Sequence, residues 1–189
     1  IPFVNVSISV HPPVYIFFAM SVMVGCDNAV NLNDGVDALR ASVTLPVMVF
    51  FAAVAFLSGK VELALLPAAL VGGLLAYLVY NFHPAQVFMG DTGSLTIGGI
   101  IGVCAVLIHK ELLLPILCGI FAVEAFSVAL QMKYFSWKKR KGQRVRIFRS
   151  APIHDTFRKL DSQLDPTSHY ILRNWPRRPY HESAITIRF

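Results

Sequence analysis

Five long apolar runs dominate the chain and restrict it to few folds. They cover residues 14–30, 41–57, 61–80, 95–108 and 112–132. Most reach the roughly 17–25 residues that a helix needs to span a bilayer. At 55% hydrophobic and 15% charged residues, the chain is too apolar for an ordinary soluble domain. We predict an all-α polytopic membrane protein, one domain over residues 1–189 with about five spanning helices. The run 95–108 is short, and a re-entrant segment is the alternative there.

The two ends of the chain and its cysteines add smaller expectations. Residues 1–13 alternate apolar and polar side chains and close on His11-Pro12-Pro13, which is typical of a short strand or hairpin arm. The three cysteines lie in apolar runs without metal-ligand spacing, so we expect buried thiols and no disulfide. The chain starts without Met and ends without a polar tail, as an internal piece of a longer protein would.

The basic residues predict which loops share a side of the membrane. Of 17 Lys and Arg, 13 lie between residues 133 and 178, and the positive-inside rule places that tail in the cytoplasm. Counting back through five spans puts residues 31–40 and 81–93 on the same side, with Lys60 and residues 109–111 outside. The basic run 138–141 has a plainer interpretation, because such residues often only set topology or touch anionic lipid.

One polar passage, residues 81–94, separates the third run from the fourth. It holds a single carboxylate, Asp91, between Gly90 and Gly93, and Ser94 opens the next apolar run. Glycines let a backbone approach a ligand closely, and a helix start offers free N–H groups and a positive dipole end. This arrangement suits a phosphate with its Mg²⁺. The alternative is an Asp/Ser cap on a membrane helix.

A second polar passage follows the first apolar run. Asn28, Asn31, Asp34 and Asp37 recur every three residues, which on a continuing helix would fan them along one side. Carboxylates and amides next to hydrocarbon are costly and usually functional. The alternative is a solvated loop of turn-forming residues around Gly35.

Three further polar residues stand out. His154 lies in a compact segment with Arg149 and Arg158 nearby, and Glu124 lies mid-span, where we favour a structural partner for a neighbouring helix. Asp27 fits either a helix-end cap or a site residue. Carboxylates, amides, a histidine and basic residues thus converge on one membrane surface, which suits a charged phosphate substrate that meets a lipid.

Four motifs, in residues 28–37, 81–94, 124–131 and 146–154, together resemble the phospho-N-acetylmuramoyl-pentapeptide transferase family of polyprenyl-phosphate N-acetylhexosamine-1-phosphate transferases. The resemblance implies a ten-helix enzyme of the bacterial inner membrane with a cytoplasmic active site. It would move phospho-MurNAc-pentapeptide from UDP-MurNAc-pentapeptide to undecaprenyl phosphate, with Mg²⁺, and form lipid I and UMP. Its implied partners are these substrates and membrane lipid, with a homodimer as an option and no nucleic acid.

The resemblance also implies residue roles. Asp91 would bind Mg²⁺, and the catalytic residues would be Asp91, Asp34 and His154. The substrate site, which holds the nucleotide and diphosphate, would be lined by Asn31, Asp34, Asp37, Asn81, Phe88, Gly90, Ser94, Gln131, His154 and Asp155.

The chain also departs from the family pattern. The family usually has Thr at the position of Asn33 and Gly at that of Ala38, and three consecutive His where this chain has His154, Asp155 and Thr156. A longer insertion, about 159–179, follows. The family's N-terminal helices, with a paired-Asp motif that would supply the base, and its last helix have no counterpart here, so we expect a fragment that is inactive alone.

We hypothesise phosphoryl transfer by positioning and charge neutralisation. The nearest rival is a sister transferase that uses UDP-GlcNAc. A rival of another class is a transporter module with Asp27, Asp34 and Glu124 as membrane acids, and a third is a non-catalytic membrane scaffold.

Overall fold

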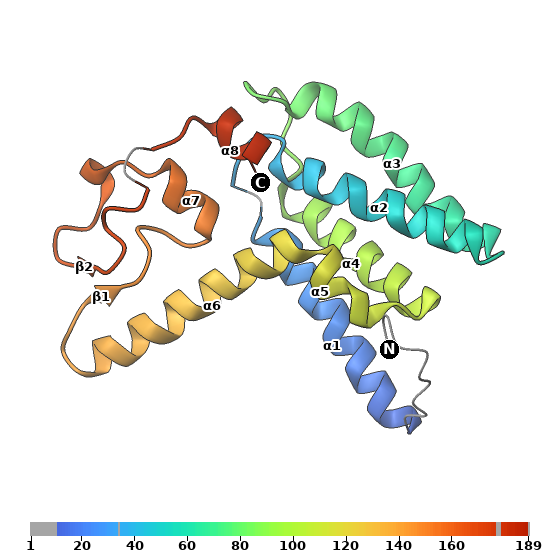
Figure 1. Ribbon diagram of the computed structural model, residues 1–189, viewed down its shortest axis with the longest axis horizontal. Helices are drawn as coiled ribbons and strands as arrows, with labels where there is room; N and C mark the ends of the chain where they lie inside the picture. Colours follow the sequence, from blue (N-terminus) through green and yellow to red (C-terminus); the bar gives the residue numbers. More distant parts are fainter. Residues whose placement is uncertain (1–10, 34, 177–178, 189) are drawn as a thin grey trace.

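The computed structural model describes residues 11–33, 35–176 and 179–188, and this part of the chain is mostly helical (Figure 1). Four helices are long and apolar enough to cross a membrane: α1 (Pro12–Asn31), α2 (Leu39–Leu57), α3 (Val61–Asn81) and α4 (Gly90–Ile108). The predicted all-α polytopic class is therefore confirmed. The strand expected over residues 1–13 falls mostly on residues outside the described part, and Pro12 and Pro13 instead open α1.

Helix α4 corrects the expectation of a short fourth span. It begins at Gly90, five residues before the apolar run, and reaches 19 residues. Asp91 lies in its first turn, where a carboxylate is stabilised by the helix dipole. The polar residues 90–94 are thus part of the helix, and α4 needs no re-entrant geometry to reach spanning length.

The fifth run does not form one straight helix. A 3₁₀ turn η1 (Glu111–Leu113) and the short α5 (Leu114–Leu117) are bent by 82° against α6 (Gly119–Arg140). The break falls at Cys118, and α6 continues eight residues beyond the predicted end of the span. The described part therefore has four candidate spans, or five if the bent pair counts as one. Figure 1 shows α6 leaving the other long helices.

The long helices pack in two close pairs, α1 with α4 and α2 with α3. Gly98 and Gly102 allow the first pair to approach closely. A Cβ atom at 98 would lie 2.6 Å from Asp27 Cα, and one at 102 would lie 3.0 Å from Met23 Cα. Such stripes of small residues are a common way for membrane helices to bring their backbones together.

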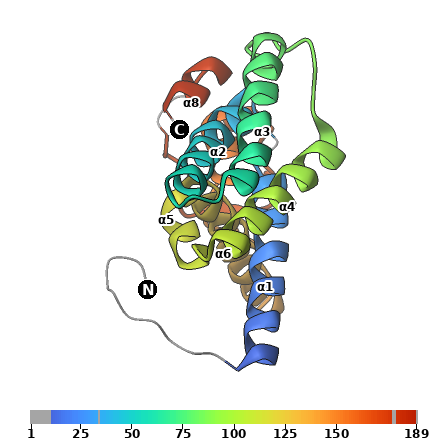
Figure 2. The same cartoon turned by 90° about the vertical axis from the view of Figure 1, so that its right-hand side faces the viewer.

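Figure 2 shows the bundle of long helices from the side, and different contacts close its two ends. At one end, the Tyr15 hydroxyl donates to Glu111, and Lys60 Nζ donates to the Leu107 carbonyl at 3.4 Å. At the other end, Ala38 N–H donates to Asn81 Oδ1 at 2.9 Å. Ala38 and Asn81, from the two polar passages, thus meet at the end of the bundle opposite Lys60, and the side of the membrane stays a prediction.

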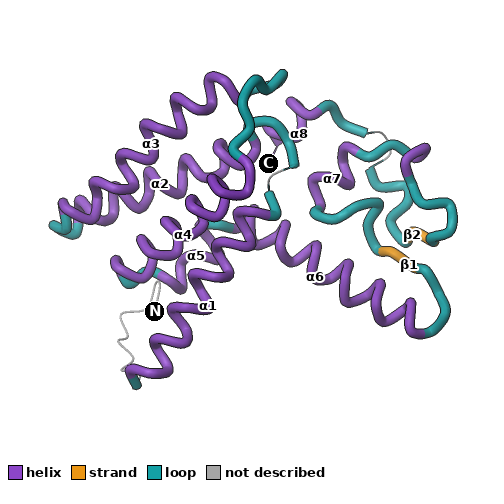
Figure 3. Tube along the Cα trace, turned by 180° about the vertical axis from the view of Figure 1, so that it is seen from behind, coloured by secondary structure: helices purple, strands orange, loops and turns teal. Residues whose placement is uncertain are grey.

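The chain after α6 forms a small unit of short elements (Figure 3). Strands β1 (Val145–Arg146) and β2 (His169–Tyr170) pair in parallel. Between and after them lie α7 (Ile153–Arg158), η2 (Asp161–Gln163) and α8 (Glu182–Arg188). The unit returns to the polar end of the bundle, because the Thr186 hydroxyl on α8 donates to the Asp37 carbonyl at 2.6 Å.

Candidate functional site

A cavity of about 140 Å³ opens at the polar end of the bundle, between the α1–α2 loop and the passage after α3. Three of the predicted site residues, Asp37, Asn81 and Phe88, help to line it. Its lining is completed by Gly35, Val36, Arg40, Tyr77 and Met89. The cavity therefore combines carboxylate, amide, guanidinium and aromatic groups from three separate segments.

Asn81 holds the two walls of this cavity together. Its Oδ1 accepts the Ala38 N–H at 2.9 Å, and its Nδ2 donates to the Val87 carbonyl at 2.7 Å. Ala38 has φ +61°, a left-handed conformation that is uncommon outside glycine. The position where the family usually has Gly thus keeps a glycine-like backbone, and the buried Asn81 amide stabilises it.

Asp37 forms the polar wall of the cavity. Its Oδ2 lies 2.9 Å from His83 Nδ1 and accepts the Ala85 N–H at 3.3 Å. His83 lies in the passage between α3 and α4, so this contact joins the same two walls as Asn81. Nothing in the spacing of the sequence singled out His83.

Arg40 brings positive charge to the start of α4. This buried residue donates from Nη1 to the Gly90 carbonyl at 3.2 Å, next to the exposed Asp91. Sequence reasoning missed both Arg40 and Tyr77, because each lies inside or at the edge of an apolar run. The signal that could have found Arg40 is that it is a lone cation three residues after Asp37, just beyond the motif 28–37.

Asn31 and Ser94 meet across the α1–α4 pair. The Ser94 hydroxyl lies 2.6 Å from Asn31 Oδ1 and 2.9 Å from the Asp91 carbonyl, so it can donate to either. The last residue of α1 is thereby tied to the first turn of α4. The structure therefore brings these two predicted site residues together within one helical turn of Asp91.

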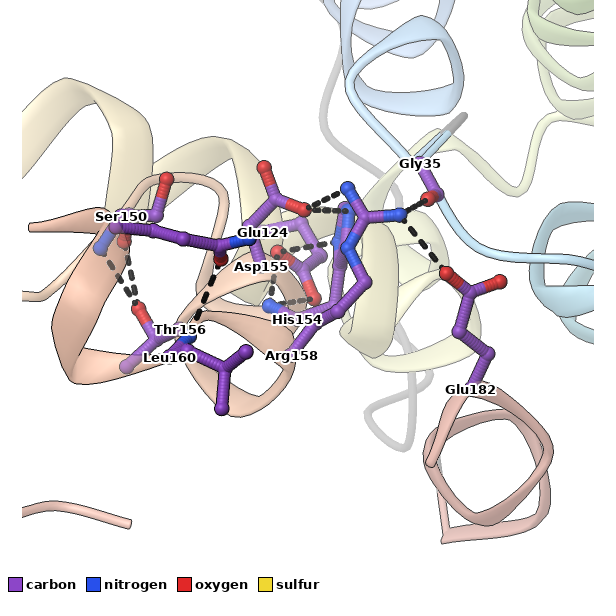
Figure 4. Close-up of polar contacts among 10 residues, drawn as sticks. Gly35, Glu124, Ser150, His154, Asp155, Thr156, Arg158, Leu160 and Glu182 are labelled. Carbon is purple, nitrogen blue, oxygen red and sulfur yellow. Dashed lines mark hydrogen bonds and ion pairs between the residues drawn. The ribbon is translucent and has the colours of Figure 1, made fainter. Parts of the chain in front are cut away.

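Glu124 and His154 form a buried pair where α6 meets α7 (Figure 4). Glu124 is 0% exposed and His154 is 1% exposed. Glu124 Oε1 accepts the His154 main-chain N–H at 3.3 Å, and Oε2 lies 3.3 Å from His154 Nδ1. The carboxylate thus satisfies a free N–H in the first turn of α7, and the expectation that Glu124 partners a neighbouring helix is confirmed.

The ring of His154 faces the α1–α2 loop. A Cβ atom at Gly35 would clash with its Nε2, so a larger residue there would require the ring to move. Arg158 reinforces the contact, because Nη1 donates to the Gly35 carbonyl at 3.0 Å and Nη2 donates to Asp155 Oδ1 at 2.9 Å. His154 and Asp155 thus lie against the loop that carries Asp37.

Comparison with known proteins assigns the chain to a family. The sequence profile of glycosyl transferase family 4 matches residues 1–109. The chain belongs to glycosyl transferase family 4. Proteins named phospho-N-acetylmuramoyl-pentapeptide-transferase from Phocaeicola vulgatus and from Bacteroides fragilis are each 44% identical over 93% of this chain and 45% of their own length. One from Flavobacterium psychrophilum is 39% identical over 94% of this chain and 42% of its own length.

The resemblance drawn from the four motifs is therefore confirmed at the level of family and relatives. The chain spans slightly under half the length of these curated relatives. The family profile covers α1 to α4 and both polar passages, which together contribute every residue that lines the cavity.

One residue expected in this glycosyl transferase site, Gln131, lies elsewhere. The buried Gln131 accepts the Ile147 and Phe148 N–H groups at 3.0 and 3.1 Å and donates to the Phe148 carbonyl at 3.3 Å. It therefore fastens the chain after β1 to α6 and is not among the residues that line the cavity. Asp34 lies outside the described residues.

The expected helical fan of Asn28, Asn31, Asp34 and Asp37 is wrong for Asp37. Helix α1 ends at Asn31, and Asp37 lies in the following loop, before α2 begins at Leu39. Asn28 lies on α1 and donates from Nδ2 to the Val24 carbonyl at 2.9 Å. The alternative of a turn-rich loop around Gly35 is the conformation found, and it places Asp37 rather than Asn28 at the cavity.

The site fits the metal that the family implies. Asp91 is exposed in the first turn of α4 and offers carboxylate oxygen. Among the described residues it belongs to no group of three metal-ligating side chains. Mg²⁺ commonly uses one or two carboxylates and takes its other ligands from water and substrate phosphates. A single exposed carboxylate is therefore an adequate protein donor for such an ion.

Proposed function

We propose that the protein containing this chain transfers phospho-N-acetylmuramoyl-pentapeptide from its UDP carrier to undecaprenyl phosphate, with lipid I and UMP as products. The observation that carries the proposal is the cavity at the polar end of the helix bundle, where Asp37, Arg40 and Phe88 from separated segments meet beside Asp91. The names of the 44% identical relatives support this substrate class.

Each wall of the cavity has a task in this reaction. Phe88 and Tyr77 offer aromatic faces for the uracil ring, since aromatic side chains stack on nucleobases. Asp37 offers hydrogen-bond acceptors to the uridine, while Arg40 places positive charge near the diphosphate. Asn81 has a positioning role, because its side chain hydrogen-bonds to both the α1–α2 loop and the passage after α3.

The phosphates are handled at the start of α4. Asp91 would hold Mg²⁺, which neutralises charge on the diphosphate when bound. Asn31 and Ser94 fix the position of the α4 first turn, and therefore of Asp91. An oxygen of the lipid phosphate attacks the sugar-linked phosphorus, the bond to the UMP oxygen breaks, and UMP leaves. His154 and Asp155 complete the proposed site against Gly35, and the family resemblance adds Asp34.

The enzymatic test uses the full-length protein in detergent with undecaprenyl phosphate and Mg²⁺. We expect UMP release and lipid I with UDP-MurNAc-pentapeptide, and neither with UDP-GlcNAc. Turnover of UDP-GlcNAc instead would identify the sister transferase. The absence of UMP release with either donor would refute a transferase and leave the transporter alternative.

The proposed location is the bacterial inner membrane with the cavity on its cytoplasmic face, because the basic residues follow α6. Single cysteines in place of Gly90 and Lys60 test this. In intact cells a membrane-impermeant thiol reagent that reaches the periplasm should label position 60 and spare position 90. Labelling at position 90 alone would invert the orientation.

A further inference from the structure

Three side chains of the types that bind metal ions gather at the edge of the cavity, apart from Asp91. Asp37 comes from the α1–α2 loop, His83 from the passage after α3, and Glu182 from the start of α8. One ligand atom from each lies within 4.8 Å of those of the other two. His83 Nδ1 and Asp37 Oδ2 are already 2.9 Å apart.

Surrounding contacts hold these three side chains in place. The Ala85 N–H donates to Asp37 Oδ2 at 3.3 Å, and the ring of His181 packs edge-on against His83 with centroids 4.8 Å apart. Arg158 Nη1 donates to Glu182 Oε1 at 3.1 Å and leaves the second carboxylate oxygen for a ligand bond. Outer contacts of this kind orient the ligands of metal sites.

The chemistry of the group favours one class of ion. The two carboxylates, Asp37 and Glu182, are balanced by one guanidinium, Arg158, so the group retains negative charge that a cation can neutralise. An imidazole nitrogen beside two carboxylates favours Zn²⁺, which binds both nitrogen and carboxylate oxygen, whereas Mg²⁺ prefers oxygen alone. The side chains of Asp37, His83 and Glu182 are 14%, 34% and 29% exposed, so an ion can enter from solvent.

We propose that Asp37, His83 and Glu182 form a Zn²⁺ site distinct from the magnesium position at Asp91. Bound Zn²⁺ would join α8 to the two loops that wall the cavity. Because Asp37 also lines the cavity, Zn²⁺ would compete with the sugar nucleotide for this carboxylate. This last consequence rests on the proposed function, whereas Zn²⁺ binding itself does not.

The test is a Zn²⁺ titration of the full-length protein against a chromophoric chelator, without substrate, after EDTA treatment and dialysis. We expect one tight equivalent in the wild type. Replacing the histidine ligand in His83→Gln should weaken that equivalent at least about 10-fold. The matched control is His169→Gln, since His169 is exposed on β2 outside the group, and Asp91→Asn should also bind as the wild type does.

Two results would overturn the proposal. The first is a His83→Gln variant that binds Zn²⁺ with the same stoichiometry and affinity as the His169→Gln control. In that outcome Glu182→Gln, the second ligand variant, would also bind Zn²⁺ as the wild type does. The other is displacement of the bound Zn²⁺ by millimolar Mg²⁺. Neither readout depends on turnover, so failure of the transferase assay would leave the titration interpretable.

Discussion

Removal of the buried Glu124 carboxylate should destabilise the protein strongly. Glu124→Ala takes away the acceptor of the His154 main-chain N–H and the group that lies 3.3 Å from His154 Nδ1. Breaking a buried pair from one side costs about 3–5 kcal/mol. We expect the lower end of this range, about 3 kcal/mol.

Glu124→Gln separates hydrogen bonding from charge. Its amide oxygen can still accept the His154 N–H, so we expect a loss of about 1 kcal/mol, the usual worth of one hydrogen bond. The control is Glu62→Ala, which removes an exposed carboxylate from the first turn of α3 and should cost under about 1 kcal/mol.

The measurement is reversible unfolding of the full-length protein in mixed micelles, followed by circular dichroism. The expected order of stability is wild type, then Glu62→Ala close to Glu124→Gln, then Glu124→Ala well below. A Glu124→Ala variant as stable as Glu62→Ala would refute the reasoning, because the carboxylate would then have no structural task at the α6–α7 junction.

Three further predictions concern single residues. Asp91→Asn should slow turnover at least about 10²-fold, roughly 2.7 kcal/mol, with normal folding, and Asp37→Asn should cost less; near-normal turnover and Mg²⁺ dependence would exclude Asp91 as the metal ligand. Gly35→Ala should cost about 1–3 kcal/mol by crowding the histidine ring, whereas Gly72→Ala, where a Cβ atom meets nothing within 4 Å, should be neutral or stabilising by thermal melting. Hydrogen bonds from the Thr167 hydroxyl, the Thr167 N–H and the Ser168 hydroxyl lower the pKa of Asp165 to about 2. Its stabilising contribution should therefore be complete above about pH 4 and fade as the pH falls towards 2, and carboxyl NMR shifts that titrate near pH 4 would contradict this.

The fold could be predicted from the sequence where hydropathy alone decides it. The first four helices follow the apolar runs closely, but two boundaries depend on more than hydropathy. Residues 90–94 look like a loop, yet they form the first turn of α4, where Asp91 favours the helix start. The break at Cys118 lies between Pro115 and Gly119 inside an unbroken apolar run, so hydropathy gives no sign of the 82° bend.

Site residues could be predicted from the sequence only where they belong to a recognisable motif. Asp37, Asn81 and Phe88 came from motifs and do line one cavity. Arg40 and His83 were missed, because their contacts join segments about fifty residues apart and depend on how α2, α3 and α4 pack. Residue type alone likewise gave no sign that Gln131 bonds to backbone groups and lies away from the cavity.

The glycine stripe on α4 has a consequence for how the bilayer acts on the protein. Ser94, Gly98 and Gly102 follow one another at intervals of four residues on the side of α4 that faces α1. The Asn31–Ser94 hydrogen bond therefore lies at the end of an α1–α4 interface in which the two backbones are in close contact. When lipid thickness changes, α1 and α4 must tilt as one body, because a change in their mutual angle would drive backbone into backbone. The distance between Asn31 and the α4 turn that contains Asp91 should therefore change little with membrane composition.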